Sequence, residues 1–256
     1  MFVNVEYQDG FAVLTLNRPD ALNALSFAVL AQLDSVLDDI EHSDARGLIV
    51  VGAGNKAFCA GADIRELNGR TLAAQKQDTL RGQATISRLA RLKMPSVAVV
   101  QGYAFGGGLE IALACTFRIA TATAKMGLPE IKLGLIPGYG GTQRLPRLIG
   151  EARALELMLS GGVLDASEAL AAGLVSRVID HGDLVGAGRE FLLPLTQYSL
   201  TASRLILESV ARGTSASLED GLRIEADLIT LAFQSADANE GMQAFIEKRK
   251  ADFKDR

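Results

Sequence analysis

Two glutamates, twenty residues apart, carry the strongest chemical signal in this sequence. Glu110 follows three consecutive glycines, Gly106 to Gly108, in an otherwise apolar segment, and Glu130 shortly precedes the glycine-rich residues 137–141. A buried carboxylate is costly unless it has hydrogen-bond partners or a chemical role. The pair therefore predicts acid and base chemistry, with one carboxyl group accepting a proton and the other donating one.

The glycines and glutamates also admit purely structural interpretations. Glycine after a strand allows a helix to pack closely on a sheet, and acidic residues are favoured in the first turn of a helix. The chemical interpretation is that unshielded N–H groups at a helix N-terminus attract negative charge, such as a developing oxyanion. Both carboxylates and two glycine-rich turns fall within residues 102–141, and a separate loop at 58–63 shares their character. We therefore favour a single chemical site.

Three other features resemble known motifs more weakly. Residues 51–57 mimic a dinucleotide-binding G-x-G-x-x-A sequence, but neither a clean helix nor an acidic strand end follows at the required distance. Cys59 lacks a histidine at the spacing of any known cysteine nucleophile, so we expect a small buried thiol. His42 and His181 lie among charged or loop residues, and we expect both at the surface.

Composition excludes several classes of protein. The chain has 256 residues, 48% of them hydrophobic, so we expect one domain with a large core and a helical extension. A net charge of −4 without clustered Lys and Arg argues against nucleic-acid binding. The apolar runs are too short to cross a membrane, and residues 1–10 lack a signal-peptide profile. The two cysteines indicate neither a disulfide framework nor a metal site, so we expect a cytoplasmic protein.

Strand and helix patterns alternate along most of the chain. Residues 3–7 and 11–17 flank Asp9-Gly10, which predicts a hairpin, and Ser26 is a predicted N-cap for the helix that follows. The remaining patterns predict strands at 47–51, 96–101 and 175–179, a helix over 71–92, and helices from 184 to 249 with breaks near 198, 213 and 236. This order predicts a largely parallel sheet with crossover helices, followed by an all-helical end.

Four segments together resemble the crotonase superfamily, specifically its short-chain enoyl-CoA hydratases. The segments are Phe58-Cys59-Ala60-Gly61-Ala62-Asp63-Ile64, residues 102–110, Leu128-Pro129-Glu130-Ile131 and residues 137–144. The resemblance runs from residues 16–19 to residues 240–250 and so covers essentially the whole chain. It implies an α/β fold in which ββα units form a spiral of two sheets over residues 1–195. Residues 196–256 would form a helical region that builds a homotrimer or a homohexamer.

The resemblance also implies a reaction and the residues that perform it. Such enzymes add water syn across a trans-2-enoyl-CoA to give a (3S)-3-hydroxyacyl-CoA. They serve fatty-acid and lipid metabolism and also the breakdown of branched amino acids and phenylacetate and the supply of polyester precursors, so the pathway stays open. In this sequence Glu110 would activate the water, Glu130 would protonate C2, and the N–H groups of Ala62 and Gly107 would hold the thioester oxygen. The Gly138 N–H would help to position the water. Neither a metal nor a separate cofactor is expected, since coenzyme A is part of the substrate.

Contacts with coenzyme A follow from the same resemblance. Ala60, Asp63 and Ile64 would lie along the coenzyme, Arg65 would lie near its phosphates, and Phe233 and Lys248 would reach it from a neighbouring subunit. The helix over 71–92 would wall the acyl pocket. The sequence departs from familiar hydratases at two positions, Thr116 and Leu128, which leaves the acyl preference open.

Two alternatives from different classes share this resemblance. A Δ3,Δ2-enoyl-CoA isomerase moves a double bond with a single carboxylate, whereas this sequence has two glutamates at the expected positions. A non-catalytic scaffold that binds acyl-CoA or RNA would not need both glutamates, and the acidic composition disfavours RNA. The paired glutamates favour the hydratase.

Overall fold

The first two strands form the hairpin that the sequence predicts. In the computed structural model, which describes residues 1–180 and 182–256, β1 (Val3–Gln8) pairs antiparallel with β2 (Phe11–Leu16). Asp9 and Gly10 join them with φ of 51° and 80°, which is the left-handed conformation that a two-residue hairpin turn requires. β2 is buried along nearly its whole length and pairs on its other side with β3.

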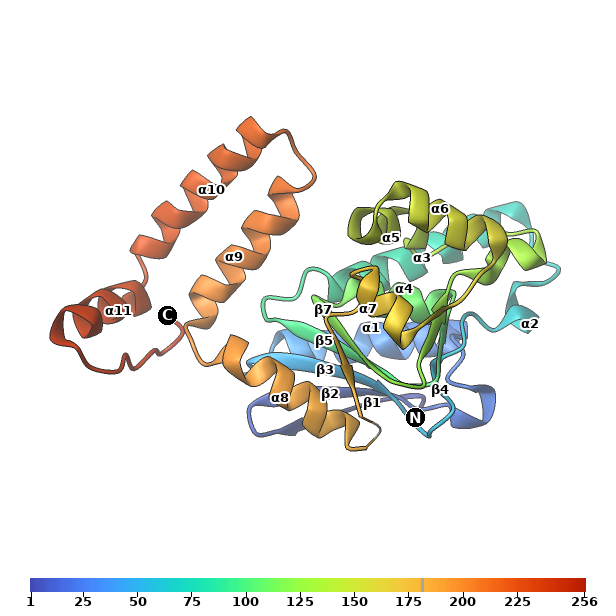
Figure 1. The fold of residues 1–256 in the computed structure, drawn as a ribbon, viewed down its shortest axis with the longest axis horizontal. Helices are drawn as coiled ribbons and strands as arrows, with labels where there is room; N and C mark the ends of the chain where they lie inside the picture. The colour runs from blue at the N-terminus through green and yellow to red at the C-terminus, as the bar shows by residue number, and fades with distance from the viewer. Residues whose placement is uncertain (181) are drawn as a thin grey trace. The chain divides into compact units, whose positions relative to one another are not determined.

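Ten strands form two sheets in the described part of the chain (Figure 1). The six-stranded sheet has the order β1-β2-β3-β5-β7-β10, with β3 Gly47–Gly52, β5 Ser96–Val100, β7 Phe117–Thr121 and β10 Arg177–Ile179. The four-stranded sheet has the order β4-β6-β8-β9, with β4 Ala57–Cys59, β6 Tyr103–Phe105, β8 Lys125–Gly127 and β9 Leu164–Asp165. Every pairing is parallel except β1 with β2 and β8 with β9, so the predicted parallel character is confirmed.

From β3 to β8, successive strands belong alternately to the large sheet and to the small sheet. Each of β3, β5 and β7 joins the large sheet, and the strand that follows it, β4, β6 or β8, joins the small sheet. Helices α3 (Leu72–Leu89) and α4 (Gly107–Ala114) then carry the chain to the next strand of the large sheet. This repetition is the spiral of ββα units that the family resemblance implies, whereas the residue patterns by themselves predict one parallel sheet.

The start of α1 agrees with the predicted cap, and α3 also begins at a capping residue. Ser26 accepts a hydrogen bond from the Val29 N–H at the start of α1 (Phe27–Glu41), and Thr71 caps α3 in the same way. The Arg88 guanidinium binds Asp34 and Asp38, which joins α3 to α1. The other helices up to residue 171 are η1 Pro19–Ala21, α2 Ile64–Leu67, η2 Pro129–Leu133, α5 Gly141–Ile149, α6 Glu151–Ser160 and α7 Ala166–Ala171.

The described residues divide into two units. One contains Met1–Leu92 and Ser96–Glu190, and the other contains Lys93–Pro95 and Phe191–Arg256. Helix α8 (Leu184–Thr196) begins in the first unit and ends in the second, which continues as α9 Leu200–Gly213, α10 Leu218–Phe233 and α11 Ala236–Glu247. Within the second unit, α9 and α10 pack side by side (Figure 1). The predicted helical breaks near 198, 213 and 236 are therefore confirmed.

Helix α4 is held at both ends. Near its start, a Cβ on Gly108 would lie 2.7 Å from the Cβ of Cys59 and closer still to the Cys59 carbonyl oxygen, so only glycine allows this approach to β4. At its end, the buried Arg118 donates to the carbonyl oxygens of Ala112 (3.3 Å), Cys115 (2.9 Å) and Leu174 (2.8 Å). These contacts fix the helix that carries Glu110.

The dinucleotide-like glycines also have a packing role. A Cβ on Gly52 would lie 2.7 Å from the Ala57 carbonyl oxygen, because the chain turns back on itself between β3 and β4. Residues 51–57 lead into β4 and not into a helix N-terminus, which removes the structural context that a dinucleotide site requires.

We predict that Gly108→Ala destabilises the fold. Helix propensity alone would favour alanine by about 1 kcal/mol. The collision with the Cys59 backbone opposes this gain, and overpacking of this kind costs about 1 to 3 kcal/mol or more. Urea denaturation should therefore show a lower unfolding free energy for the variant.

The matched control is Gly221→Ala, which lies inside α10. There the new Cβ would meet backbone atoms of Gly213 at 3.5 Å or more, which are ordinary contacts. We expect this variant to be unchanged or stabilised by roughly 0.5 to 1 kcal/mol. Equal effects at the two positions would contradict the packing argument.

Candidate active site

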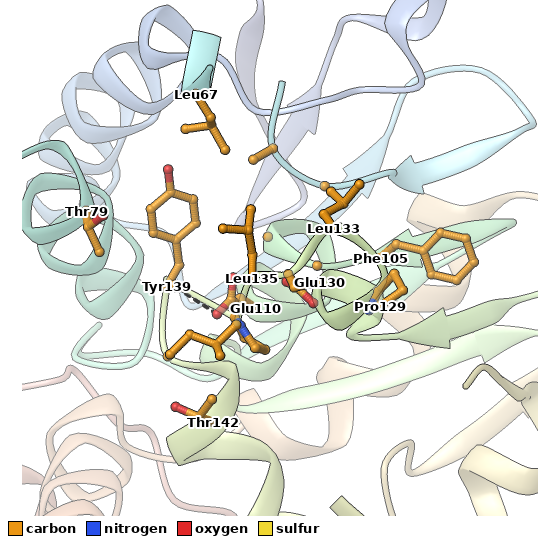
Figure 2. A pocket seen from close by; sticks show the side chains of 18 of the residues that line it. Leu67, Thr79, Phe105, Glu110, Pro129, Glu130, Leu133, Leu135, Tyr139 and Thr142 are labelled. Atoms are coloured by element: carbon orange, nitrogen blue, oxygen red, sulfur yellow. Dashed lines mark hydrogen bonds between the residues drawn. The ribbon is translucent and has the colours of Figure 1, made fainter. Parts of the chain in front are cut away.

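A cavity of about 580 Å³ brings the two glutamates together (Figure 2). Its walls come from segments far apart in the sequence: the loop that follows β4, the start of α4, the η2 helix with the loop after it, and one face of α3. Most of the lining surface is apolar. Glu110 and Glu130 are the carboxyl groups that line it, so a molecule inside would meet two ionisable groups in largely apolar surroundings.

Glu110 is almost completely buried, with 1% of its surface exposed. Its Oε1 atom accepts hydrogen bonds from the N–H groups of Tyr139 and Gly141, both at 2.7 Å. The loop between η2 and α5 can come this close because Gly141 has no side chain, and a Cβ there would lie 3.1 Å from Oε1. One carboxyl oxygen is thus fixed by the protein backbone.

Burial raises the pKa of Glu110 from its ordinary value of 4.5 to about 7. The two backbone N–H groups and the Arg144 guanidinium oppose this shift, whereas the nearby Glu130 carboxylate adds to it. Glu110 therefore exchanges its proton near neutral pH. A general base that works near neutrality needs this property.

Glu130 lies at the start of η2, directly after Pro129. Burial raises its pKa as well, and its own N–H group opposes the shift. The Oε2 atom is buried and has no hydrogen-bond partner in the described part of the chain. The other oxygen faces Gly106, where a Cβ would lie 2.9 Å from it. Glu130 thus lines the cavity with one carboxyl oxygen that the described residues leave unpaired.

Two backbone N–H groups at the cavity are unpaired among the described residues. Gly107 is the first residue of α4, so its N–H has no partner within the helix. The residues on either side of Ala62 pair with Leu25: the Leu25 N–H donates to the Gly61 carbonyl oxygen, and the Asp63 N–H donates to the Leu25 carbonyl oxygen, both at 2.8 Å. This pairing does not use the N–H of Ala62 itself. Both Ala62 and Gly107 line the cavity, as does Gly138. Their predicted roles toward a thioester oxygen and a water molecule stay predictions.

The predicted coenzyme A contacts fall into two groups. Ala60 and Ile64 line the cavity, and Ile64 is 48% exposed. Asp63 caps α2 through the Arg65 N–H and pairs with Arg18 at 2.9 Å, which lowers the Asp63 pKa. The side chain of Asp63 is therefore engaged within the protein.

The remaining two predicted contacts belong to the second unit. Phe233 is the last residue of α10 and is 56% exposed, and Lys248 follows α11 with φ of 55°. Their proposed contact with coenzyme A stays a prediction.

Several residues at the cavity have no role in the sequence-based site. Gln75, Thr79 and Gln83 form one stripe along α3 and line the cavity, which agrees with the implied wall at 71–92. The ring of Tyr139 lies between Leu67 and Glu110 in the close view (Figure 2). Gly82 makes room for this ring, since a Cβ there would lie 2.8 Å from the Tyr139 Cδ1 atom. Only the proximity of Tyr139 to the glycine motif signals it in the sequence.

The other candidate groups are structural. Cys59 is buried, and burial raises the pKa of its thiol to about 12, so it holds its proton at neutral pH. His42 follows α1, is exposed and contacts the Asp38 carbonyl oxygen, whereas His181 lies outside the described residues.

Across residues 1–180 and 182–256, no cluster of three metal-ligating side chains occurs. Over the same residues, no helix combines the length and apolarity that a membrane crossing needs.

Comparison with known proteins identifies the protein family. The profile of the enoyl-CoA hydratase/isomerase family matches residues 6–256, so the chain belongs to this family. It is 44% identical over 250 residues to a probable enoyl-CoA hydratase of Mycobacterium bovis, covering 97% of this chain and 96% of that one. A short-chain-enoyl-CoA hydratase of Clostridium acetobutylicum is 38% identical over 256 residues, covering 99% and 98%.

A solved structure supports the same assignment. The crystal structure of an enoyl-CoA hydratase from Bacillus anthracis superposes with a TM-score of 0.94 at 38% identity, covering 100% of each chain. The fold is therefore the crotonase fold, as the sequence motifs imply.

Burial of Glu110 predicts a cost in stability at high pH. Below pH 4.5 the carboxyl group is protonated in both the folded and the unfolded chain. As pH rises from 4.5 to about 7, the unfolded chain loses the proton and the folded chain keeps it, so stability falls. Each unit of pKa is worth about 1.4 kcal/mol, so the folded form loses up to about 3 kcal/mol by pH 8.

Glu110→Gln removes this titration. We expect its unfolding free energy, relative to the unmodified protein, to increase by up to about 3 kcal/mol between pH 4.5 and pH 8 in urea denaturation. Glu151→Gln, at an exposed position in the first turn of α6, provides the matched control. A difference between Glu110→Gln and the unmodified protein that does not change with pH would contradict the assigned pKa shift.

Proposed function

We propose that this protein is an enoyl-CoA hydratase that adds water to a trans-2-enoyl-CoA thioester. The observation that carries the proposal is the meeting of two partly or fully buried carboxyl groups with two unpaired backbone N–H groups in one apolar cavity. Membership of the enoyl-CoA hydratase/isomerase family and the names of the relatives support it.

The two carboxyl groups divide the proton transfers. The Glu110 carboxylate accepts a proton from water while the water oxygen bonds to C3, and the C2–C3 π bond breaks. Glu130, in its protonated form, delivers a proton to C2. The product is a 3-hydroxyacyl-CoA, and proton exchange between the carboxyl groups and solvent restores the starting state. Addition of both atoms from the side of the glutamates makes the reaction syn, and we propose the (3S) product.

The N–H groups of Ala62 and Gly107 stabilise the charge that develops on the thioester oxygen. Fixed donors of this kind are worth about 2.7 to 4 kcal/mol each in acyl-transfer enzymes. The Gly107 N–H also lies at the N-terminus of α4, where the helix dipole favours negative charge. The Gly138 N–H, which has no acceptor among the described residues, helps to hold the attacking water.

The fit to coenzyme A follows the shape of the site. We propose that the thioester enters along Ala60 to Ile64 with Arg65 near the phosphates, and that the acyl chain extends toward α3. No metal and no second cofactor take part in this scheme, and we place the enzyme in the cytoplasm. The two buried free cysteines are consistent with a reducing compartment.

We predict that the protein hydrates crotonyl-CoA and that Glu110→Gln and Glu130→Gln each lower kcat on the order of 10² to 10⁴-fold. This is the usual contribution of a positioned acid or base, and isosteric glutamine should leave substrate binding less affected. Loss of the enoyl-thioester absorbance gives the rate. Glu151→Gln should keep full activity.

Three outcomes would count against the proposal. If crotonyl-CoA and longer enoyl-CoA thioesters were all unchanged by the unmodified enzyme, the hydratase function would be wrong. Full activity of one glutamine variant would remove that glutamate and favour an isomerase with one carboxylate. Loss of activity after treatment with a chelator would contradict the metal-free scheme.

We also propose that the second unit builds a homotrimer, or a homohexamer made of two trimers. On α10 and α11, seven large apolar side chains are more than half exposed, an extent typical of interaction surfaces: Leu218, Leu222, Ile229, Leu231, Phe233, Phe245 and Ile246.

Light scattering should therefore give three or six times the chain mass of 27.1 kDa. The double variant Leu218→Lys with Leu222→Lys should lower this mass, because a charged side chain is costly to bury in an interface. Arg223→Gln, on the same helix at an exposed and already polar position, should not. A fully active single chain at nanomolar concentration would contradict both the assembly and the shared coenzyme A contacts of Phe233 and Lys248.

A further inference from the structure

The backbone that binds Glu110 is intrinsically loose. Residues 137–141 follow η2, end with the first residue of α5 and contain three glycines, Gly138, Gly140 and Gly141. Glycine gives up more conformational freedom than any other residue when it is fixed in one conformation. Nevertheless, the Tyr139 and Gly141 N–H groups must both point at one oxygen of Glu110. Something outside the loop must hold it in this conformation.

Arg144 provides that restraint from the first turn of α5. Its Nη1 atom donates to the Tyr139 carbonyl oxygen at 2.8 Å, and its Nη2 atom donates to the Ser87 hydroxyl of α3 at 3.0 Å. A Cβ on Gly140 would lie 3.1 Å from the guanidinium Cζ, so the side chain is packed against the loop. A planar group with donors on two sides can bridge the loop and the helix in this way.

A second hydrogen bond supports the same loop. Gln83 of α3 donates from Nε2 to the Gly138 carbonyl oxygen at 2.8 Å. Tyr139 is therefore held at both of its backbone groups, with its N–H on Glu110 and its C=O on Arg144. Rotation of this residue away from Glu110 would break both bonds together.

The charges around Glu110 and Arg144 favour the same arrangement of the loop. Glu110 faces Glu130 from η2, the Tyr139 and Gly141 N–H groups from the loop, and Arg144 from α5. Arg144 in turn faces Glu110 and the like charge of Arg91. Burial lowers the pKa of Arg144, but an arginine keeps its proton throughout the physiological range. Arg144 is therefore a permanent cation close enough to influence the charge of the carboxyl group that we propose as the base.

We propose that Arg144, anchored by Ser87, is a positioning residue that holds the 139–141 backbone on Glu110 and so keeps that carboxyl group oriented and ionised for proton transfer. The expected effect of Arg144 on turnover rests on the proposed hydratase function. The expected effect of Arg144 on the orientation and ionisation of the Glu110 carboxyl group does not need that function.

Removal of Arg144 has a defined direction. The cation lowers the pKa of Glu110, and so do the two N–H groups that it restrains. Loss of either raises the pKa above its present value of about 7. A base must be ionised, so kcat/KM falls at pH values below the pKa of Glu110. The acid limb of the pH profile of kcat/KM, which is the part where the rate falls as pH falls, should therefore move to higher pH when Arg144 is removed.

The test compares Arg144→Met with Arg147→Met across pH 5 to 9. Arg147 is exposed, lies on the same helix and, among the described residues, donates to Gln143 alone, so its loss changes net charge equally without touching the loop. We expect Arg144→Met to shift the acid limb upward by about half a pH unit or more. It should also lower kcat by on the order of 10-fold to 100-fold, as misplacement of a catalytic group does. Arg147→Met should match the unmodified enzyme.

Two further variants separate orientation from charge. Arg144→Lys keeps the cation but cannot bond Tyr139 and Ser87 as a fork, so it should lose kcat while its acid limb moves less than that of Arg144→Met. Ser87→Ala removes only the anchor and should shift kcat in the same direction by a smaller factor. If Arg144→Met does not fold, as judged by circular dichroism, Arg144→Lys and Ser87→Ala carry the test.

Titration of Glu110 itself makes the inference independent of turnover. Carbon-13 labelled glutamate, with the Glu110 signal assigned from Glu110→Gln, reports the carboxyl pKa in the absence of substrate. A higher pKa in Arg144→Met supports the proposal even if the unmodified protein hydrates no enoyl-CoA. An identical Glu110 titration in Arg144→Met, Arg147→Met and the unmodified protein would overturn it, whatever the activity.

Discussion

The burial of the Glu110 carboxyl group is the constraint on which the site depends. With 1% of its surface exposed, this group would hold its proton strongly if nothing compensated for the lost water. Two backbone N–H groups at 2.7 Å supply partial compensation, and the result is a pKa of about 7. The same two bonds tie α4 to the loop before α5, so the chemistry of the carboxyl group and the position of the loop are set together.

Glycine serves both packing and chemistry around this group. Gly108 allows α4 to approach β4, which is the structural interpretation of the glycine run. Gly107 presents an unpaired N–H to the cavity, and Gly106 leaves space for an oxygen of Glu130, which agrees with the chemical interpretation. The two interpretations are compatible because neighbouring glycines on a helix face different surroundings.

The spiral explains why the site draws on distant segments. Each turn places one strand in the large sheet and the next in the small sheet, and the segments that follow β4, β6 and β8 line the same cavity. Ala62, Gly107 and Glu130 each follow one of these strands. Repetition of one unit thus brings together, from successive turns, groups that are far apart along the chain.

The sequence by itself determined the local elements and the most conspicuous chemical groups. The Asp9-Gly10 turn and the Ser26 cap depend on residues within a few positions, and a charge such as Glu110 is visible because its neighbours are apolar. The residue patterns could not predict the division into two sheets, because strands of two or three residues, such as β4 and β9, are too short to show an alternation of apolar and polar residues. Only the family resemblance implied the second sheet. Tertiary structure alone decided the surroundings of Glu110. Its contacts with Tyr139 and Gly141 span 29 and 31 residues, and that between Arg144 and Ser87 spans 57, so packing of separate elements and not local preference creates them.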